Sequence, residues 1–184
     1  MGNRERIETF ADIAISSALD ERFERVSVRD PRARPLFEEL EYEYRSRYED
    51  VISTQELRNE MTRYADDLFA PPKGAFVLLI RGETAVAGGA FMPHADAGTA
   101  EFKRIWASRA LRRQGLARRV LGELENEAAR LGYTRVFLGT GPRQPEAISL
   151  YTHSGYTLLS AHDFGEDAPP GYHFEKLLAR GAGT

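Results

Sequence analysis

The stretch Arg112-Arg113-Gln114-Gly115-Leu116-Ala117 decides how the fold of this 184-residue chain is interpreted. It joins a predicted strand at 100–107 to a predicted helix at 115–130. The helix is predicted from apolar side chains that recur every three or four residues: Leu116, Val120, Leu124, Ala128 and Leu131. Gly115 lets the backbone turn tightly at this junction and lets a ligand come close to it.

The junction is a candidate phosphate site. The first N–H groups of a helix have no partner within the helix and lie at the positive end of its dipole, where anions bind. Five nearby arginines would add charge-assisted hydrogen bonds: Arg109, Arg112, Arg113, Arg118 and Arg119. The same pattern alone fits a solvated cationic helix end equally well, so the assignment depends on the rest of the chain.

The remaining elements predict an α/β fold. Strands are predicted at 23–29, 75–80, 84–92, 100–107, 135–138, 156–160 and 172–178, and helices at 36–48, 53–68, 115–130 and 145–153. Ser53 and Glu56 have the spacing of a capping box for the second helix. The order predicts a mixed central sheet of about seven strands, antiparallel in its N-terminal part and flanked by about four helices. Residues 1–22 are predicted as a helical N-terminal extension, and 23–184 as a single domain.

Composition limits the kinds of partner. Acidic residues number 28 and basic ones 25, which gives a net charge of −3, so no nucleic acid is expected as a partner. No apolar run approaches the roughly 20 residues that span a bilayer, and the start lacks an apolar signal core, so we expect a cytoplasmic protein without membrane contact. The chain has no cysteine, and its four histidines lack a metal-ligand spacing, so no metal is expected. The oligomeric state stays open, a homodimer included.

A second motif gives the junction its context. The pattern Arg-x-x-Gly-x-Ala after a strand resembles motif A of the GNAT superfamily of N-acetyltransferases. Downstream, Gln144-Pro-Glu-Ala147-Ile-Ser-Leu150-Tyr151-Thr-His-Ser-Gly155-Tyr156 resembles motif B of that superfamily, with Gln144 where the family often has asparagine. Two motifs in the correct order are far more specific than either alone. The resemblance is strong over residues 75–160, and the inferred element order extends it to 24–178.

The resemblance implies a GNAT fold, in which strands four and five splay apart, and acetyl-coenzyme A as the co-substrate. The loop that cradles the coenzyme A pyrophosphate corresponds to Arg112, Arg113, Gln114, Gly115, Leu116 and Ala117. The backbone partners of the pantetheine arm correspond to Ile105, Trp106 and Ala107, where an N–H group would stabilise the oxyanion. The Trp106 side chain is expected in the core. Gln144 and Ala147 stand where motif B contacts the cofactor, although the longer amide side chain makes the Gln144 hydrogen bond open to question.

Two residues are candidates for proton transfer. Tyr151 matches the family tyrosine whose hydroxyl lies near the coenzyme sulfur, and a phenol with a pKa of about 10 can protonate a departing thiolate. Glu101 lies eleven residues before Arg112, where some family members carry a catalytic glutamate. Its neighbours Ala100 and Phe102 predict partly apolar surroundings, which would raise the pKa of a carboxyl group. The alternatives are a substrate-holding carboxylate and a water chain with no fixed base.

The implied activity is transfer of an acetyl group from acetyl-coenzyme A to a primary amine, expected on a small molecule, by direct attack on the thioester. The alternatives are a protein or peptide acetyltransferase, which would need an open groove, and a non-catalytic coenzyme A-binding sensor. Glu101 and Tyr151 argue against the sensor, and the net negative charge disfavours an RNA-directed acetylating toxin. Acceptor specificity is expected from the charged helix at 36–48 and the loop at 161–173.

Overall fold

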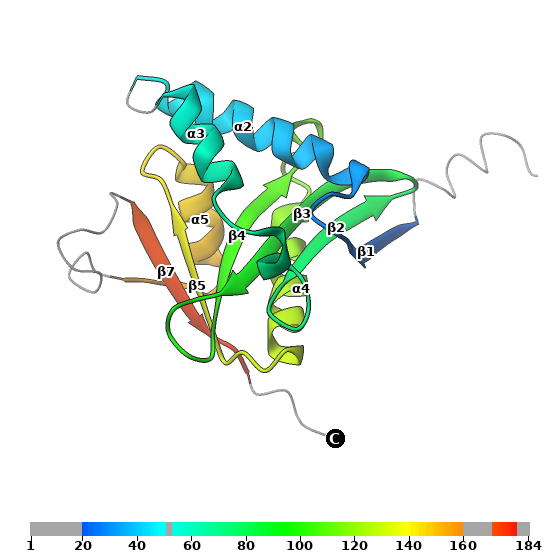
Figure 1. The fold of residues 1–184 in the computed structure, drawn as a ribbon, viewed down its shortest axis with the longest axis vertical. Helices are drawn as coiled ribbons and strands as arrows, with labels where there is room; N and C mark the ends of the chain where they lie inside the picture. The colour runs from blue at the N-terminus through cyan, green and yellow to red at the C-terminus, as the bar shows by residue number, and fades with distance from the viewer. Residues whose placement is uncertain (1–19, 51–52, 160–170, 180–184) are drawn as a thin grey trace, which may run out of the picture.

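A computed structural model describes residues 20–50, 53–159 and 171–179 of the chain. Its core is a mixed seven-stranded sheet with the strand order β1-β2-β3-β4-β5-β7-β6 (Figure 1). The strands are β1 (Glu21–Arg25), β2 (Ala75–Arg81), β3 (Thr84–Pro93), β4 (Thr99–Ala107), β5 (Arg135–Thr140), β6 (Thr157–Leu158) and β7 (Tyr172–Leu177). Among these described strands β4 and β5 are parallel and every other neighbouring pair is antiparallel, which confirms the predicted α/β class.

Helices cover both faces of the sheet. The α-helices are α2 (Arg34–Tyr48), α3 (Thr54–Thr62), α4 (Leu116–Arg130) and α5 (Pro145–His153), and the short 3-10 turns are η1 (Pro31–Ala33), η2 (Asp66–Phe69) and η3 (Arg109–Leu111). Figure 1 shows α2 and α3 on one side of the sheet and α4 and α5 on the other. The order of strands and α-helices agrees with the prediction from sequence.

Several predicted boundaries were wrong. β1 is predicted at 23–29 but runs from Glu21 to Arg25, because its antiparallel register with β2 ends at Arg25 and Val77. The second helix is predicted to reach residue 68, but α3 ends at Thr62 and the separate turn η2 follows. The capping box at its start is confirmed: Ser53 Oγ accepts from the Glu56 N–H at 3.2 Å, and Glu56 Oε2 accepts from the Ser53 N–H at 2.8 Å. Residues 1–19 of the predicted N-terminal helix and residues 161–170 of the predicted specificity loop lie outside the described residues.

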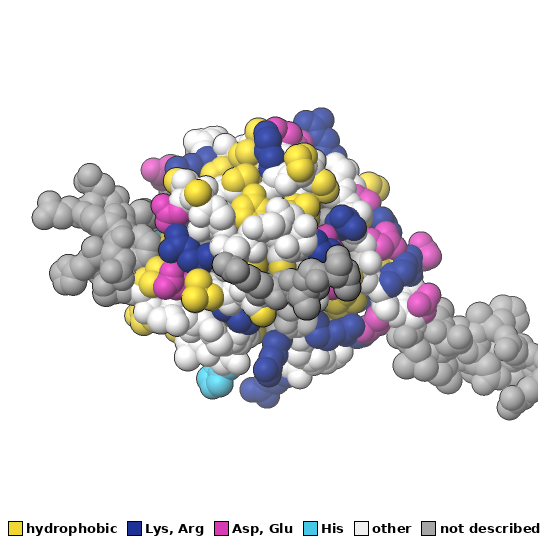
Figure 2. Space-filling view, turned by 90° about the horizontal axis from the view of Figure 1, so that it is seen from below, with side chains coloured by type: hydrophobic (Ala, Val, Ile, Leu, Met, Phe, Trp, Pro, Cys, Tyr) yellow, Lys and Arg dark blue, Asp and Glu magenta, His cyan; other side chains and the backbone are white. Residues whose placement is uncertain are grey.

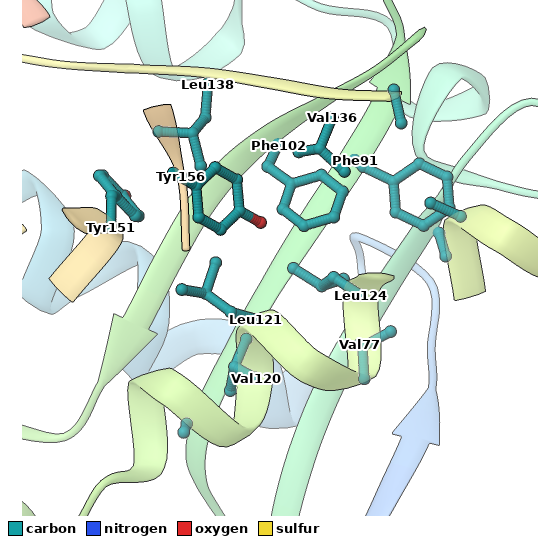
Figure 3. Close-up of a cluster of buried hydrophobic side chains, with 14 of the residues drawn as sticks. Val77, Phe91, Phe102, Val120, Leu121, Leu124, Val136, Leu138, Tyr151 and Tyr156 are labelled. Carbon is teal, nitrogen blue, oxygen red and sulfur yellow. The ribbon is translucent and has the colours of Figure 1, made fainter. Parts of the chain in front are cut away.

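The sheet separates two apolar cores. The larger core lies between the sheet and the helices α4 and α5 (Figure 3). Val120, Leu121 and Leu124 of α4 are almost completely buried there, and each such side chain contributes about 1.5–3 kcal/mol to folding. The second core lies under α2 and η2 and contains Leu36 and Trp106. These two cores hold the long helix α4 and the end of β4 in fixed positions relative to each other.

The parallel strands β4 and β5 separate after a short paired stretch. Their register runs from Thr99 and Arg135 to Phe102 and Leu138, after which both strands continue without pairing to each other. Just beyond, β4 carries a bulge against β3, and Arg104 in the bulge has a positive φ of 58°. Bulges bend and twist a strand, which accounts for the divergence at this point. The predicted splay of the fourth and fifth strands is confirmed.

Candidate active site

The loop between β4 and α4 presents backbone N–H groups at a helix N-terminus. Gly115 is the residue that precedes the first turn of α4 and has a φ of +72°, a left-handed conformation that only glycine adopts without strain. Arg113 also has a positive φ, of 64°. No described side chain caps the start of α4, and a Cβ built on Gly115 would meet no atom within 4 Å. The first turn of α4 therefore has donors and open space for an anion, which fits a pyrophosphate.

Contacts with neighbouring side chains hold the side chains in and beside this loop. Glu43 of α2 is 17% exposed and forms an ion pair with Arg112. The same carboxylate lies 3.9 Å from the Arg109 side chain, whose guanidinium stacks over the Tyr42 ring at 4.4 Å. Gln114 accepts a hydrogen bond from Arg81 at 3.3 Å. Arg112 remains 52% exposed, so its charge still faces any anion that approaches the loop.

The last residues of β4 expose one backbone edge. Trp106 and Ala107 pair with Gly88 and Ala87 of β3, whereas the pairing with β5 ends at Phe102. The edge towards β5 is therefore available to an extended ligand chain. Ile105 packs against the core on the α4 side.

The Trp106 side chain belongs to the core, as predicted. It is 4% exposed and packs in the core under α2. Its Nε1 donates to Glu39 of α2 at 2.9 Å, and the same carboxylate accepts from the Arg109 N–H at 3.0 Å. Glu39 thus ties the end of β4 and the start of the phosphate loop to one helix.

The start of α5 closes the other side of the opening. Gln144 Oε1 accepts from the Thr140 hydroxyl at 2.8 Å and from the Gly141 N–H at 3.2 Å. Its side-chain oxygen is therefore used within the loop, and the amide nitrogen is the donor left for a ligand. Ala147, in the first turn of α5, packs against the larger core.

Tyr151 of α5 is buried in the larger core, where Figure 3 shows it near Tyr156. Its ring lies 5.5 Å from that of Phe174 and 5.9 Å from that of Tyr156. Burial raises the pKa of Tyr151 well above its usual value of 10, and Tyr44 adds to the shift. Among the described residues this hydroxyl makes no hydrogen bond, and its raised pKa keeps it protonated.

Glu101 lies on the sheet face opposite to Tyr151. Its carboxylate is 16% exposed and lies 2.7 Å from the Lys103 ammonium. Burial lowers the pKa of Lys103, but Glu101 and Tyr64 together outweigh burial and the net direction is upward. Ala100 and Phe102, from which partly apolar surroundings were expected, point into the larger core on the other face, and the apolar ring in register with Glu101 is Phe137 of β5. The alternation of side chains along a strand explains this, since sequence neighbours face opposite ways.

A row of aromatic rings beside Glu101 was not predicted from the sequence. Phe137 of β5 lies between His94 and His173, with ring centroids at 4.7 Å and 5.6 Å. Burial lowers the pKa of His173, with Glu101 raising and Lys103 lowering it. The histidines are scattered in sequence, and only the strand order, which places β7 beside β5, brings His173 to this face. Alternation within β7 was the one signal that could have assigned it a face.

Over residues 20–50, 53–159 and 171–179, no group of three or more His, Cys, Asp or Glu side chains could hold a metal ion. Among the helices of the described ranges, none has the length and apolar character of a membrane span.

Comparisons with known proteins agree with this geometry. Residues 34–156 match the model of the Acetyltransferase (GNAT) family. An IAA acetyltransferase of Azospirillum brasilense is 30% identical over 114 residues, which cover 55% of this chain and 74% of that protein. An acetyltransferase structure from Streptococcus agalactiae has a TM-score of 0.68 at 16% identity, over 87% of this chain and 99% of that one.

The PaiA N-acetyltransferase of Thermoplasma acidophilum, solved in complex with coenzyme A, has a TM-score of 0.61 at 16% identity. The similarity covers 86% of this chain and 99% of that one. The family match extends from α2 through the phosphate loop and α5 to Tyr156, and so includes both predicted motifs. The chain therefore belongs to the acetyltransferase (GNAT) family and is an N-acetyltransferase.

Proposed function

We propose that this enzyme transfers the acetyl group of acetyl-coenzyme A directly to a primary amine of a small molecule. The observation that carries the proposal is the opening between β4 and β5, which begins after Phe102 and Leu138. It lies between an uncapped helix N-terminus and a buried, protonated tyrosine. The chain has no cysteine, so a thiol acyl-enzyme is not available and direct attack by the amine is favoured.

The same opening has the parts that coenzyme A requires. The backbone of the Arg112–Ala117 loop would bind the pyrophosphate at the start of α4, and the free edge of Ile105–Ala107 would pair with the pantetheine arm. The amide nitrogen of Gln144 and the side chain of Ala147 would contact the arm from α5. When bound, the co-substrate supplies the thioester and its thiolate leaving group. A backbone N–H group in 105–107 would stabilise negative charge on the carbonyl oxygen.

Tyr151 is proposed as the proton donor to the departing thiolate. Its hydroxyl stays protonated, because burial raises its pKa. A proton donor at this position lowers the barrier to breaking the carbon–sulfur bond. A non-catalytic sensor would have no need for a buried phenol there.

Glu101 is proposed as the carboxylate at the acceptor end of the proton route. The amine arrives mainly as ammonium and must lose a proton before it attacks. Glu101 lies on the face opposite α5, and its ion pair with Lys103 holds the carboxylate in place. Glu101 would act on this proton directly, through water or through a neighbouring side chain.

A small acceptor is favoured over a protein by the connection between α2 and the β5–α5 loop. Arg47 of α2 forms an ion pair with Glu146 of α5, and Arg143 of the loop pairs with Asp50 at 2.5 Å. The Tyr48 hydroxyl accepts from the Arg143 N–H at 3.0 Å. These contacts join the C-terminal end of α2 to the loop before α5, which supports a bounded acceptor site rather than an open groove.

The surface charges also bear on the class of partner. On the face seen in Figure 2, basic and acidic side chains are interspersed around an apolar area. This mixture, with the net charge of −3, supports a small acceptor over a long polyanion.

The proposal is tested by incubating the protein with acetyl-coenzyme A and a panel of primary amines, with free thiol as the readout. We expect thiol release that depends on a particular small amine. A second panel of lysine-containing peptides separates the two acceptor classes. Faster release with peptides would replace the small-molecule proposal, and binding of coenzyme A with no amine-dependent release would favour the sensor.

A further inference from the structure

His173 lies where the pairing of β4 with β5 ends. It pairs with Gly139, which follows Leu138, the last residue of β5 that pairs with β4. Its imidazole takes the space of a side chain at position 139: a Cβ built on Gly139 would lie 3.1 Å from His173 Cδ2 and 3.4 Å from Nε2. The ring also stacks on Phe137, with an interplanar angle of 15°. The absence of a side chain at 139 thus lets a ring nitrogen lie over the strand at the start of the opening.

Strand alternation places this ring on the same face as Glu101. Phe174 points into the larger core, so its neighbour His173 points to the opposite face. Glu101 pairs in register with Phe137, on which His173 stacks. The ring therefore lies on the same sheet face as the proposed acceptor carboxylate, with β5 between them, and farther along β5 towards the opening.

We infer that His173 accepts the proton of the incoming amine, and that Glu101 stabilises the imidazolium that forms. The inference rests on the proposed function, because it needs an amine acceptor. His173 is then the side chain through which Glu101 acts on the amine proton, in place of a direct contact or a water chain.

The charges around the ring fit a base. Burial lowers the pKa of His173 below its ordinary value of 6.5, so the imidazole is neutral at neutral pH and can take a proton. Glu101 favours the protonated form and Lys103 opposes it. The other charged groups of this region are paired: Arg135 of β5 lies 3.5 Å from Glu175 of β7 and 2.7 Å from Asp96. His94, on the far side of Phe137, accepts from the Asp96 N–H at 3.1 Å.

The proton balance of the step is complete without a further reactant. His173 takes one proton from the ammonium, and the neutral amine forms a bond to the thioester carbonyl carbon. The carbon–sulfur bond then breaks, and the thiolate takes a proton from Tyr151. Tyr151 regains its proton from the nitrogen that becomes the amide, and imidazolium at His173 releases its proton to solvent.

The experiment compares pH profiles of kcat/KM for the wild type, His173→Gln and His94→Gln, using the amine that the panel identifies. We expect the wild-type profile to fall on the acid side at a pKa below 6.5. His173→Gln should lose about 100-fold at neutral pH and recover as the pH approaches the pKa of the amine. Imidazole added to His173→Ala should restore part of the rate. His94→Gln removes the other imidazole that packs against Phe137 and should leave the profile unchanged.

A second readout does not depend on turnover. Titration of the histidine ring protons by NMR should give His173 a pKa below 6.5, and Glu101→Gln should lower it further, because Glu101 favours the charged form. An equal profile for wild type and His173→Gln, a raised KM alone, or no effect of Glu101→Gln on the His173 titration would overturn the inference. A wild type that acetylates no amine would remove the proposed function and the inference with it, so the two failures are distinguishable.

Discussion

Replacement of Gly115 by valine perturbs the proposed phosphate loop at one backbone position. Gly115 has a φ of +72°, and a Cβ there would meet no protein atom within 4 Å. The cost to folding therefore comes from the left-handed backbone alone, about 1–2 kcal/mol or slightly more for a β-branched side chain. For a domain of this size, that corresponds to a decrease in Tm of about 2–8 °C.

The cost to coenzyme A binding has a different source. The open space beside Gly115 is where the pyrophosphate is proposed to lie, and a valine side chain would occupy it. Loss of one hydrogen bond between a backbone N–H and a charged phosphate costs about 1.5–3 kcal/mol. Since about 1.4 kcal/mol is tenfold in affinity, the Kd for coenzyme A should rise roughly 10- to 100-fold.

Gly132 provides a matched control at the other end of α4. It has a φ of +90°, and a Cβ there would also meet no atom within 4 Å. Gly132→Val should lower Tm by a similar amount and leave coenzyme A affinity unchanged. Calorimetric titration below both transition temperatures gives the two Kd values. Equal affinity of Gly115→Val and wild type, or equal losses in the two variants, would refute the placement of the pyrophosphate at this loop.

Three further predictions follow from the contacts at the site and on the surface. Tyr151→Phe should lower turnover about 100-fold with little change in coenzyme A affinity, because it removes a proton donor and keeps the ring. Tyr156→Phe is the control, since that hydroxyl donates to Glu125 at 2.9 Å. Equal rates in Tyr151→Phe and wild type would exclude the proton-donor role. Glu101→Gln should depress kcat near neutral pH, and the loss should shrink as rising pH makes more of the amine neutral. Glu175→Gln, on the same face, should leave kcat unchanged. A loss of kcat that does not depend on pH would contradict the role of Glu101 in proton transfer. The arginine partners of Glu21, Glu24 and Asp30 lower the pKa of each carboxyl group. The ion pairs therefore stabilise the fold fully above the ordinary pKa values of 4.5 for Glu and 3.8 for Asp, and this stabilisation is lost as the pH falls below them. Tm should fall on acidification through that range, and a Tm that rises there would show that the pairs do not stabilise the fold.

The sequence predicted the architecture well where patterns are local. The apolar period of α4, the capping box at Ser53 and the glycine at 115 each carry their own structural signal, and all three are found as predicted. The end of α3 and the extent of β1 were not predicted, because strand pairing and a separate turn set these boundaries.

Sequence patterns identified only the part of the candidate site whose residues are contiguous in the chain. The loop at 112–117 is continuous in sequence, so local signals are enough to identify it as a candidate phosphate site. Glu101 is different, because its ion pair with Lys103 depends on the alternation of β4, and the apolar ring on its side comes from Phe137 of β5 and not from its sequence neighbours. His173 reaches the same face only through the order in which β5 and β7 pair. Contacts between strands distant in sequence carry no local pattern.

The central claim is that the acetyl group passes directly from the thioester to an amine held at the opening between β4 and β5. The most direct test measures initial rates over a matrix of acetyl-coenzyme A and amine concentrations, with thiol and N-acetyl product quantified together. The account predicts intersecting double-reciprocal lines and one N-acetylamine for each thiol released. Parallel lines, or thiol release without N-acetyl product, would contradict direct transfer to an amine.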